Sequence, residues 1–146
     1  MYDMTTVSQV LHNKTEKAVF SISPEATVLE AISLMAVKGI GALVVIDGQT
    51  VVGILSERDY TRKVALMERS SYNTTVSEIM THKVLMVSLN NTVEDCLQLM
   101  TDRHLRHLPV MEDHQLIGLI SIGDLVKAAM EDQQQMIEQL QQYISG

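Results

Sequence analysis

The sequence predicts an α/β chain of the mixed α+β kind, built from two β-α-β-β-α repeats and a C-terminal amphipathic helix. Residues 23–59 align without a gap onto residues 88–124, and ten of the 37 aligned pairs are identical. Such a fixed offset indicates a duplicated unit. Within each copy the apolar residues alternate between strand spacing and helix spacing. The core must be aliphatic, because 46% of the residues are apolar and only 3% are aromatic.

The duplication divides the 146 residues into three expected segments. We place the first repeat at residues 6–69, the second at residues 74–130 and a helical extension at residues 131–146. Each copy has its own lead-in, since residues 7–11 resemble residues 76–80. Two units this small need each other to form a core.

Each copy contains a helix with a clear start. Thr27 and Glu30 have the spacing of a capping box, and Thr92 with Asp95 is a weaker version. The following apolar residues form one buried face at helical spacing in each copy: Val28, Ala31, Ile32 and Met35, and Val93, Cys96, Leu97 and Met100.

Short apolar runs predict the strands. They lie at residues 17–21, 42–46 and 51–55 in the first copy, and at residues 83–88, 108–111 and 116–120 in the second. Gly39 and Gly41 end the first helix. The last two strands of each copy flank a polar turn and therefore predict a hairpin. A second helix begins at Ser56 and at Ser121.

The closing segment is amphipathic. Its apolar residues recur at three- and four-residue steps: Val126, Ala129, Met130, Met136, Ile137, Leu140, Tyr143 and Ile144. A helix from Ser121 to about Tyr143 would be ~34 Å long, which exceeds so small a unit. We expect it either to cover its own repeat or to contact a second copy or a partner protein.

Composition excludes several classes of function. A formal charge of −7 and the scarcity of aromatic residues argue against a nucleic-acid surface. The longest apolar runs are strand-sized, so no membrane span is expected. The single Cys96 makes no internal disulfide, and residues 1–4 lack the pattern of a secretory signal. We therefore expect a soluble cytoplasmic protein.

One motif recurs at the same place in both copies. Residues 53–59 read Gly-Ile-Leu-Ser-Glu-Arg-Asp and residues 118–124 read Gly-Leu-Ile-Ser-Ile-Gly-Asp. Both fit Gly-h-h-Ser/Thr-x-x-Asp, with h apolar, at a strand-to-helix junction. With this motif in two copies of β-α-β-β-α, the chain from Thr6 to about Met130 resembles the cystathionine-beta-synthase (CBS) domain family, whose tandem pair is called a Bateman module.

The motif has two physical interpretations. The glycine permits close backbone approach, the helix start attracts phosphate, and an aspartate one turn in can accept hydrogen bonds from a ribose diol. Alternatively, Ser-x-x-Asp is only a helix cap. Aspartate is shorter than the usual Glu or Gln of a capping box and should reach back less well. Because the glycine and the apolar residues recur with it, we favour ligand binding.

The resemblance implies that the repeats pack about a pseudo-twofold axis and form two clefts for adenosyl ligands. One cleft would combine Ile54, Ser56 and Asp59 with Val84, Arg106 and His107. The other would combine Leu119, Ser121 and Asp124 with Ala18, Gly41 and Ala42. The two aspartates would hold ribose hydroxyls, and the apolar strand residues would enclose adenine. AMP is the first expected ligand, with ADP, ATP, NAD and S-adenosylmethionine as alternatives.

The two implied clefts differ in charge. Arg106 and His107 face the cleft of Asp59, whereas small uncharged residues occupy the matching places beside Asp124. Arg58 and Arg62 would add to the basic end. We therefore expect phosphate to prefer the Asp59 cleft.

Catalysis and metal binding have little support. His104 and His107 lie beside arginines and lack further ligands for a four-ligand set. Cys96 lies on the buried face of its helix, so it is a packing residue. Ser56 and Ser121 have no recurring histidine to act as a base. We expect no enzyme activity and no metal.

The sequence thus predicts a stand-alone regulatory module. It would bind an adenine nucleotide, form a homodimer and signal through a conformational change to a regulated protein partner. The alternative is a structural or interaction module with vestigial clefts that acts by dimerisation or partner docking.

Overall fold

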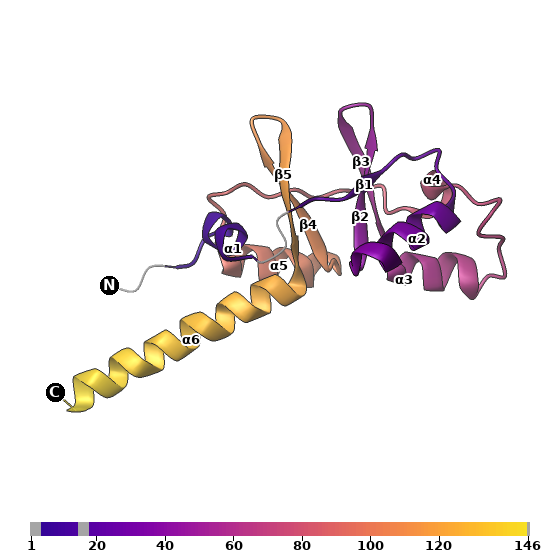
Figure 1. Cartoon of the computed structure of the whole chain (residues 1–146). Helices are drawn as coiled ribbons and strands as arrows, with labels where there is room; N and C mark the ends of the chain where they lie inside the picture. The colour runs from indigo at the N-terminus through magenta and orange to yellow at the C-terminus, as the bar shows by residue number, and fades with distance from the viewer. Residues whose placement is uncertain (1–3, 15–17, 146) are drawn as a thin grey trace. The chain divides into compact units, whose positions relative to one another are not determined.

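The chain folds as two compact units. A computed structural model describes residues 4–14 and 18–145. One unit is Ala18–Leu85, and the other combines the two ends of the chain, Met1–Lys17 and Met86–Gly146 (Figure 1). Each unit contains a β-hairpin with helices packed beside it, so the mixed α+β fold with two repeats is confirmed.

The Ala18–Leu85 unit has a three-stranded sheet in the order β1-β2-β3. Its elements are β1 (Ser21–Ile22), α2 (Val28–Lys38), β2 (Ala42–Asp47), β3 (Thr50–Ser56), α3 (Glu57–Tyr60), η1 (a π-helical turn, Thr61–Ala65) and α4 (Val76–Ile79). β1 is parallel to β2, and β2 is antiparallel to β3. The register shifts between Val45 and Ile46, which marks a β-bulge.

The second unit repeats this plan with a two-stranded sheet, β4-β5. Its elements are α1 (Val7–Asn13), α5 (Val93–Arg103), β4 (His107–Glu112), β5 (Gln115–Ser121) and α6 (Ile122–Ser145). The hairpin is antiparallel and shifts register between Val110 and Met111, which is the position that matches the bulge of the first hairpin. The predicted hairpins are therefore present in both repeats.

The apolar faces predicted from helical spacing form the cores. In α2 the buried residues are Val28, Ala31 and Met35, and in α5 they are Val93, Cys96 and Met100. The first set packs with Leu43, Leu55 and other aliphatic side chains. A left-handed residue follows each helix: Gly39 has φ 66° and His104, at the matching position, has φ 55°.

Each lead-in packs onto the repeat that it does not precede. Val28 N–H donates to the Thr74 carbonyl at 2.9 Å, and Val76 N–H donates to the Ala26 carbonyl at 2.8 Å, so α4 belongs to the unit of the first repeat. Val93 N–H donates to the Thr5 carbonyl at 2.9 Å, which places α1 in the unit of the second repeat. The repeats in the sequence and the compact units are therefore two different divisions of the chain.

The first strand is shorter than the sequence indicates. Of the predicted strand at residues 17–21, Lys17 lies outside the described residues, and β1 covers only Ser21–Ile22. In place of the strand predicted at residues 83–88, Val87 makes one parallel bridge to Val110. The apolar spacing of a segment predicts a strand, but it does not show how many backbone hydrogen bonds the segment makes with the edge of the hairpin.

The capping pattern of α2 and α5 is the reverse of the prediction. The Thr92 and Asp95 pair forms the complete capping box, whereas Thr27 accepts from Glu30 N–H without a reciprocal bond. The interpretation of the second pair as the weaker one was wrong, because the short Asp95 side chain reaches the Thr92 amide at 3.0 Å.

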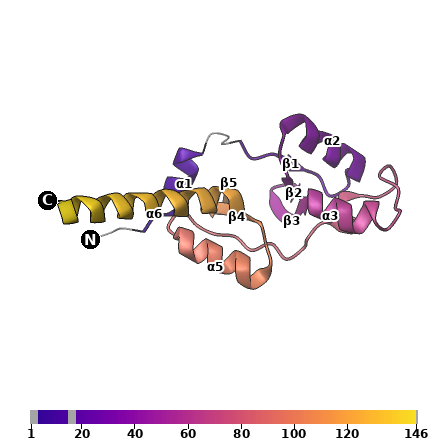
Figure 2. The ribbon, with the colours of Figure 1, turned by 90° about the horizontal axis from the view of Figure 1, so that it is seen from below.

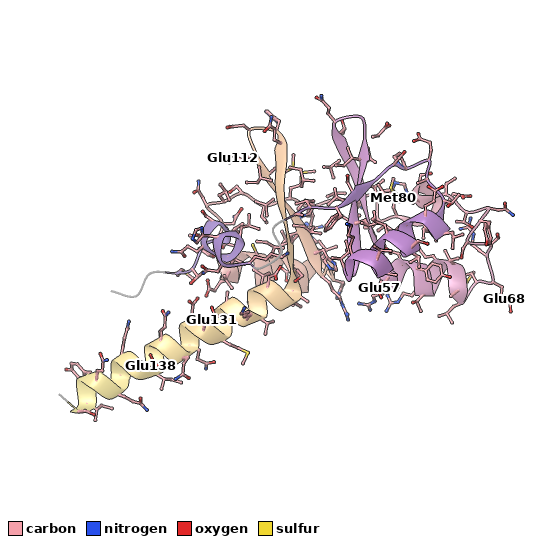
Figure 3. The ribbon with its side chains drawn as sticks, viewed as in Figure 1. Glu57, Glu68, Met80, Glu112, Glu131 and Glu138 are labelled. Carbon is pink, nitrogen blue, oxygen red and sulfur yellow. The ribbon has the colours of Figure 1, made fainter. Side chains whose placement is uncertain are left out.

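Helix α6 projects beyond the rest of its unit. It has 24 residues and is about 36 Å long. Its first turns bury Leu125 and Ala128, while Leu140 and Ile144 near its end are exposed. The helix contacts α1 and α5, and its C-terminal part extends away from both (Figures 1 and 2). Glu138 lies on the projecting part (Figure 3). The long helix predicted from Ser121 to about Tyr143 is confirmed. Within residues 4–14 and 18–145, no helix is long and apolar enough to cross a bilayer.

The first residue of each motif is a glycine because a lead-in crosses it closely. A Cβ added to Gly53 would lie 2.6 Å from Met80 Sδ and 3.0 Å from the Thr81 carbonyl oxygen, and one added to Gly118 would lie 2.8 Å from Leu11 Cδ2. In Figure 3 Met80 lies next to β3. The close approach anticipated for the motif glycine is thus made by the chain itself.

We predict that Gly53→Ala lowers the free energy of unfolding by about 1–3 kcal/mol, because the backbone of Thr81 must move to admit the methyl group. Urea unfolding measures this change. Gly123→Ala is the control: its Cβ would meet only Ser121 Oγ at 3.6 Å, and alanine is favoured in a helix by about 0.5–1 kcal/mol. Equal stability of Gly53→Ala and the parent would show that the lead-in is not seated tightly on β3.

Candidate functional site

The two recurring motifs form equivalent strand-to-helix junctions, from β3 to α3 and from β5 to α6. Ser56 is the N-cap of α3, and its Oγ accepts from Asp59 N–H at 3.1 Å. Ser121 Oγ accepts from Asp124 N–H at the same distance, 3.1 Å. Each serine therefore satisfies one amide of the first helical turn.

Each motif aspartate completes a capping box. Ser56 N–H donates to Asp59 Oδ2 at 2.9 Å, and Ser121 N–H donates to Asp124 Oδ2 at 2.9 Å. The expectation that aspartate reaches back poorly was wrong. The extended backbone of the cap residue Ser56, with φ −118° and ψ 162°, turns its N–H toward the carboxylate, so the shorter side chain suffices. The cap occupies Oδ2 of both residues and leaves Oδ1 for other contacts.

Asp59 lies in a polar environment with only 14% of its side chain exposed. Its Oδ1 is 3.2 Å from Lys63 Nζ and 3.5 Å from Thr81 Oγ1. Lys63 also donates to the Ile79 carbonyl at 2.9 Å. The carboxylate is therefore held in one orientation by its own helix and by the segment that follows α4.

Asp124 is held by a lysine that comes from the other end of the chain. Lys14 Nζ lies 2.9 Å from Asp124 Oδ2 and donates to the Leu119 carbonyl oxygen at 2.7 Å. Burial by itself raises the pKa of Asp124, but the Ser121 amide and the Lys14 ammonium outweigh it and hold the pKa below its ordinary value. Asp124 is thus ionised at neutral pH.

The remaining predicted residues lie near the motif of their own unit. Ala42 pairs with Ser56 across the hairpin, and the Gly41 carbonyl accepts from Glu57 N–H at 3.0 Å. The equivalents in the second unit repeat this arrangement, since His107 pairs with Ser121 and the Arg106 carbonyl accepts from Ile122 N–H at 2.9 Å. The grouping of each aspartate with residues of the other repeat stays a prediction.

The other predicted residues divide between the two units. Ile54 and Leu119 are half-buried at matching positions of β3 and β5, and Arg58 is exposed on α3. Ala18 and Val84 lie in irregular segments of the Ala18–Leu85 unit. Ile54 forms an antiparallel bridge with Thr81, so its backbone is already paired.

Sequence reasoning missed Lys63 and Lys14. Lys63 lies four residues after Asp59, a spacing typical of helical ion pairs, and that spacing could have revealed it. Lys14 has no comparable signal, because it meets Asp124 only through the packing of α1 against the second repeat. The predicted charge difference, with Arg58 and Arg62 after Ser56 but Gly123 and Lys127 after Ser121, included neither of these lysines, and each aspartate has one.

A polar groove lies between α1 and α6. It has a volume of about 960 Å³, and Lys14, Asp124 and Lys127 are among its walls. Further along it, Thr5 Oγ1 donates to Asp132 Oδ1 at 2.6 Å. Asp132 Oδ2 is buried and has no hydrogen-bond partner among the described residues.

The side chains considered for metal binding and catalysis remain apart. In the described part of the chain, no three His, Cys, Asp or Glu residues are grouped so that they could hold a metal ion. Cys96 is fully buried, and burial, with a smaller contribution from Asp95, raises the pKa of its thiol to about 11. This thiol is therefore a core group and not a nucleophile at neutral pH.

Comparison with known proteins finds the same arrangement elsewhere. The CBS domain family matches residues 7–66 and 76–131. The CBS domain-containing protein CBSX3, mitochondrial, of Arabidopsis thaliana is 38% identical over 153 residues, covering 99% of this chain and 74% of its own length. This relative leaves the expected cytoplasmic location of the present chain without support.

Solved structures agree with the fold. A protein with CBS domains from Burkholderia ambifaria is 51% identical, covers 88% of this chain and 96% of its own, and superposes with a TM-score of 0.84. The CBS domain pair of protein MJ0100, solved with 5′-methylthioadenosine and S-adenosyl-L-methionine, is 21% identical with a TM-score of 0.74 and covers 86% of this chain and 95% of its own. Two matched repeats, both with the Gly-h-h-Ser-x-x-Asp junction, show that the chain belongs to the CBS domain family.

Proposed function

We propose that this CBS domain pair is a regulatory sensor that binds an adenosyl ligand at Asp59 and Asp124. The observation that carries the proposal is the pair of fixed, half-buried carboxylates at equivalent junctions, each with one oxygen engaged by the helix cap. A carboxylate that is ionised and already oriented accepts hydrogen bonds from a ribose diol at little ordering cost. AMP is the ligand that we propose first, with ADP, ATP, NAD and S-adenosylmethionine as alternatives.

The surroundings of the carboxylates suit the rest of such a ligand. Ile54 and Leu119 are half-buried apolar residues two positions before the cap serines, and aliphatic side chains of this kind can enclose adenine. Asp124 has a lowered pKa and so keeps its charge at physiological pH. The ligands of the MJ0100 CBS pair are both adenosyl compounds, which supports the ligand class and not AMP in particular.

A regulated protein partner would respond to the conformational change that ligand binding causes. A ligand that binds one conformation of the chain better than another shifts the population toward it. This chain uses the serine of each junction as a helix cap, and the Ser56 hydroxyl also donates to Asp59 Oδ2 at 3.1 Å, an oxygen that the capping box already engages. We therefore assign it regulation and not catalysis.

Helix α6 favours a second function, self-association. Five exposed apolar residues follow the three- and four-residue steps of a coiled-coil seam: Val126, Met130, Ile137, Leu140 and Ile144. Gln133 fills the remaining seam position. We propose that this stripe pairs with the same stripe of a second copy to form a homodimer. A module with vestigial clefts would retain this function alone.

We predict that a thermal-shift panel of AMP, ADP, ATP, NAD and S-adenosylmethionine raises the melting temperature with at least one of them, because a ligand bound only by the native state stabilises it. At a ligand concentration about 100 times Kd the stabilisation is about 2.7 kcal/mol. Guanosine monophosphate serves as the control for ribose phosphate without adenine. If no adenosyl compound raises the melting temperature at millimolar concentration, the sensor function is refuted and self-association is the remaining function.

We predict that Asp59→Asn and Asp124→Asn each lower affinity for the bound ligand by about ten- to a hundredfold, since a charge-assisted hydrogen bond contributes about 1.5–3 kcal/mol. Asparagine retains an oxygen for the cap, so the helix start is preserved. Calorimetric titration measures the affinity. The matched control is Asp95→Asn, which alters a capping box of the same geometry outside the motif and should leave binding unchanged. A loss of similar size in that control would contradict a ligand role for the motif aspartates.

We predict that ending the chain after Asp132 converts the dimer to a monomer, because the truncation removes three of the five seam residues. Light scattering coupled to size exclusion measures the mass. The full-length double variant Ile137→Glu with Leu140→Glu should give the same result, since two buried charges at the seam cost more than the contact provides. A truncated chain that remains a dimer would place the contact elsewhere.

A further inference from the structure

We propose that Lys14 makes the Asp124 site selective for an adenosyl ligand with negative charge next to its ribose, an adenosine monophosphate, over the cationic S-adenosylmethionine. This inference rests on the proposed function. The observation that carries it is the position of the Lys14 ammonium, 2.9 Å from Asp124 Oδ2 and 2.7 Å from the Leu119 carbonyl oxygen.

The two junctions differ in the group that donates a hydrogen bond to the backbone carbonyl two residues before the cap serine. In the first, the Ile54 carbonyl accepts from the Thr81 backbone N–H at 2.9 Å. In the second, the matching carbonyl of Leu119 accepts from the Lys14 ammonium. A neutral amide in one junction is thus replaced by a full positive charge in the other.

The fold fixes the position of the Lys14 side chain, which is less exposed than an ordinary surface lysine. Only 23% of its side chain is exposed, whereas Lys63, the lysine beside Asp59, is 44% exposed. Its two contacts use two of the three N–H groups of the ammonium, and the third can donate to a ligand oxygen. Because the lysine is partly desolvated and anchored to a backbone carbonyl, its attraction for a phosphate is stronger than that of a mobile surface lysine.

The charges along the groove limit the length of the anionic group. Lys127, one turn after Asp124, adds a second cation near the same end. Glu131 follows one turn later on α6 (Figure 3). Glu131 and Asp132 both line the groove, so the part of it that lies further along the helix is negative. A single phosphate beside Lys14 has two cations, Lys14 and Lys127, to offset the charge of Asp124, whereas the outer phosphates of ATP would approach the further carboxylates of Glu131 and Asp132.

The arrangement admits one opposing interpretation. Lys14 could act as a latch that pairs with Asp124 Oδ2 and excludes every ligand from the carboxylate. The two interpretations predict opposite changes in affinity when Lys14 is replaced. Removal of a latch strengthens the binding of all adenosyl compounds, whereas removal of a selecting cation weakens the binding of the anionic compounds alone.

The experiment isolates the Asp124 site in an Asp59→Asn background and titrates Lys14→Gln with AMP, ATP, neutral 5′-methylthioadenosine and S-adenosylmethionine. We expect AMP affinity to fall by about tenfold or more, the equivalent of one charge-assisted hydrogen bond. The affinity for 5′-methylthioadenosine should be unchanged and that for S-adenosylmethionine should rise. AMP should bind more tightly than ATP before the substitution and lose that advantage after it.

Two controls keep the result interpretable. Lys14→Arg retains the charge and should retain the preference for AMP, which excludes a loss of fold as the cause. Lys38→Gln removes one positive charge from the end of α2 and should change nothing.

Three results overturn the inference. Equal losses for AMP and 5′-methylthioadenosine would make Lys14 a structural residue. Tighter binding of all compounds would make it a latch. Binding of 5′-methylthioadenosine without any preference for AMP before Lys14 is replaced would refute the selectivity while the proposed function stands. Binding of no adenosyl compound by the chain with both aspartates intact would refute the proposed function itself.

Discussion

The close packing of each lead-in against the glycine that opens each motif determines the geometry of both junctions. Met80 and Thr81 lie against Gly53, and Leu11 lies against Gly118. This contact brings Thr81 to 3.5 Å from Asp59 and allows Lys14, three residues after Leu11, to reach Asp124. A side chain at either glycine would push the lead-in away and remove a partner of the aspartate. The glycine is thus required by packing, and the surroundings of the carboxylate follow from it.

Helix capping and ligand binding are compatible uses of the same carboxylate. In the Asp59 junction Oδ2 accepts from Ser56 while Oδ1 points to Lys63 and Thr81. The cap fixes the side chain in one rotamer, and an acceptor that is already fixed loses little entropy on binding. The capping geometry therefore prepares the aspartate for a diol instead of competing with that function. The capping box of Thr92 and Asp95 has the same hydrogen bonds, but Asp95 is exposed to solvent and lies outside the recurring motif, so we propose no ligand role for it.

Local patterns in the sequence predicted the elements that depend on local forces. The apolar spacing of residues 28–35 identified the buried face of α2, Gly39 marked its end, and the polar turns located both hairpins. The exchange of the lead-ins was not predictable from the offset between copies, because similarity in sequence does not say which surface a segment covers. The contact of Lys14 with Asp124 was not predictable for the same reason, because it arises only from the exchange of the lead-ins. The π-helical turn Thr61–Ala65 likewise has no periodic signal.

Helix α6 connects the proposed ligand site with the proposed dimer contact. Asp124 lies in its first turn, and Leu140 and Ile144 lie near its end. An α-helix rises about 1.5 Å per residue, so the seam residues lie about 24–30 Å from the aspartate along a single rigid element. A tilt of a few degrees at Asp124 therefore moves the distal seam by one to a few ångströms, roughly the scale of helix shifts at subunit interfaces in known switches. Because Lys14 binds both β5 and Asp124, a ligand phosphate that draws the ammonium toward itself acts on the start of this helix directly. Anion selectivity and transmission to a second copy would then depend on the same lysine.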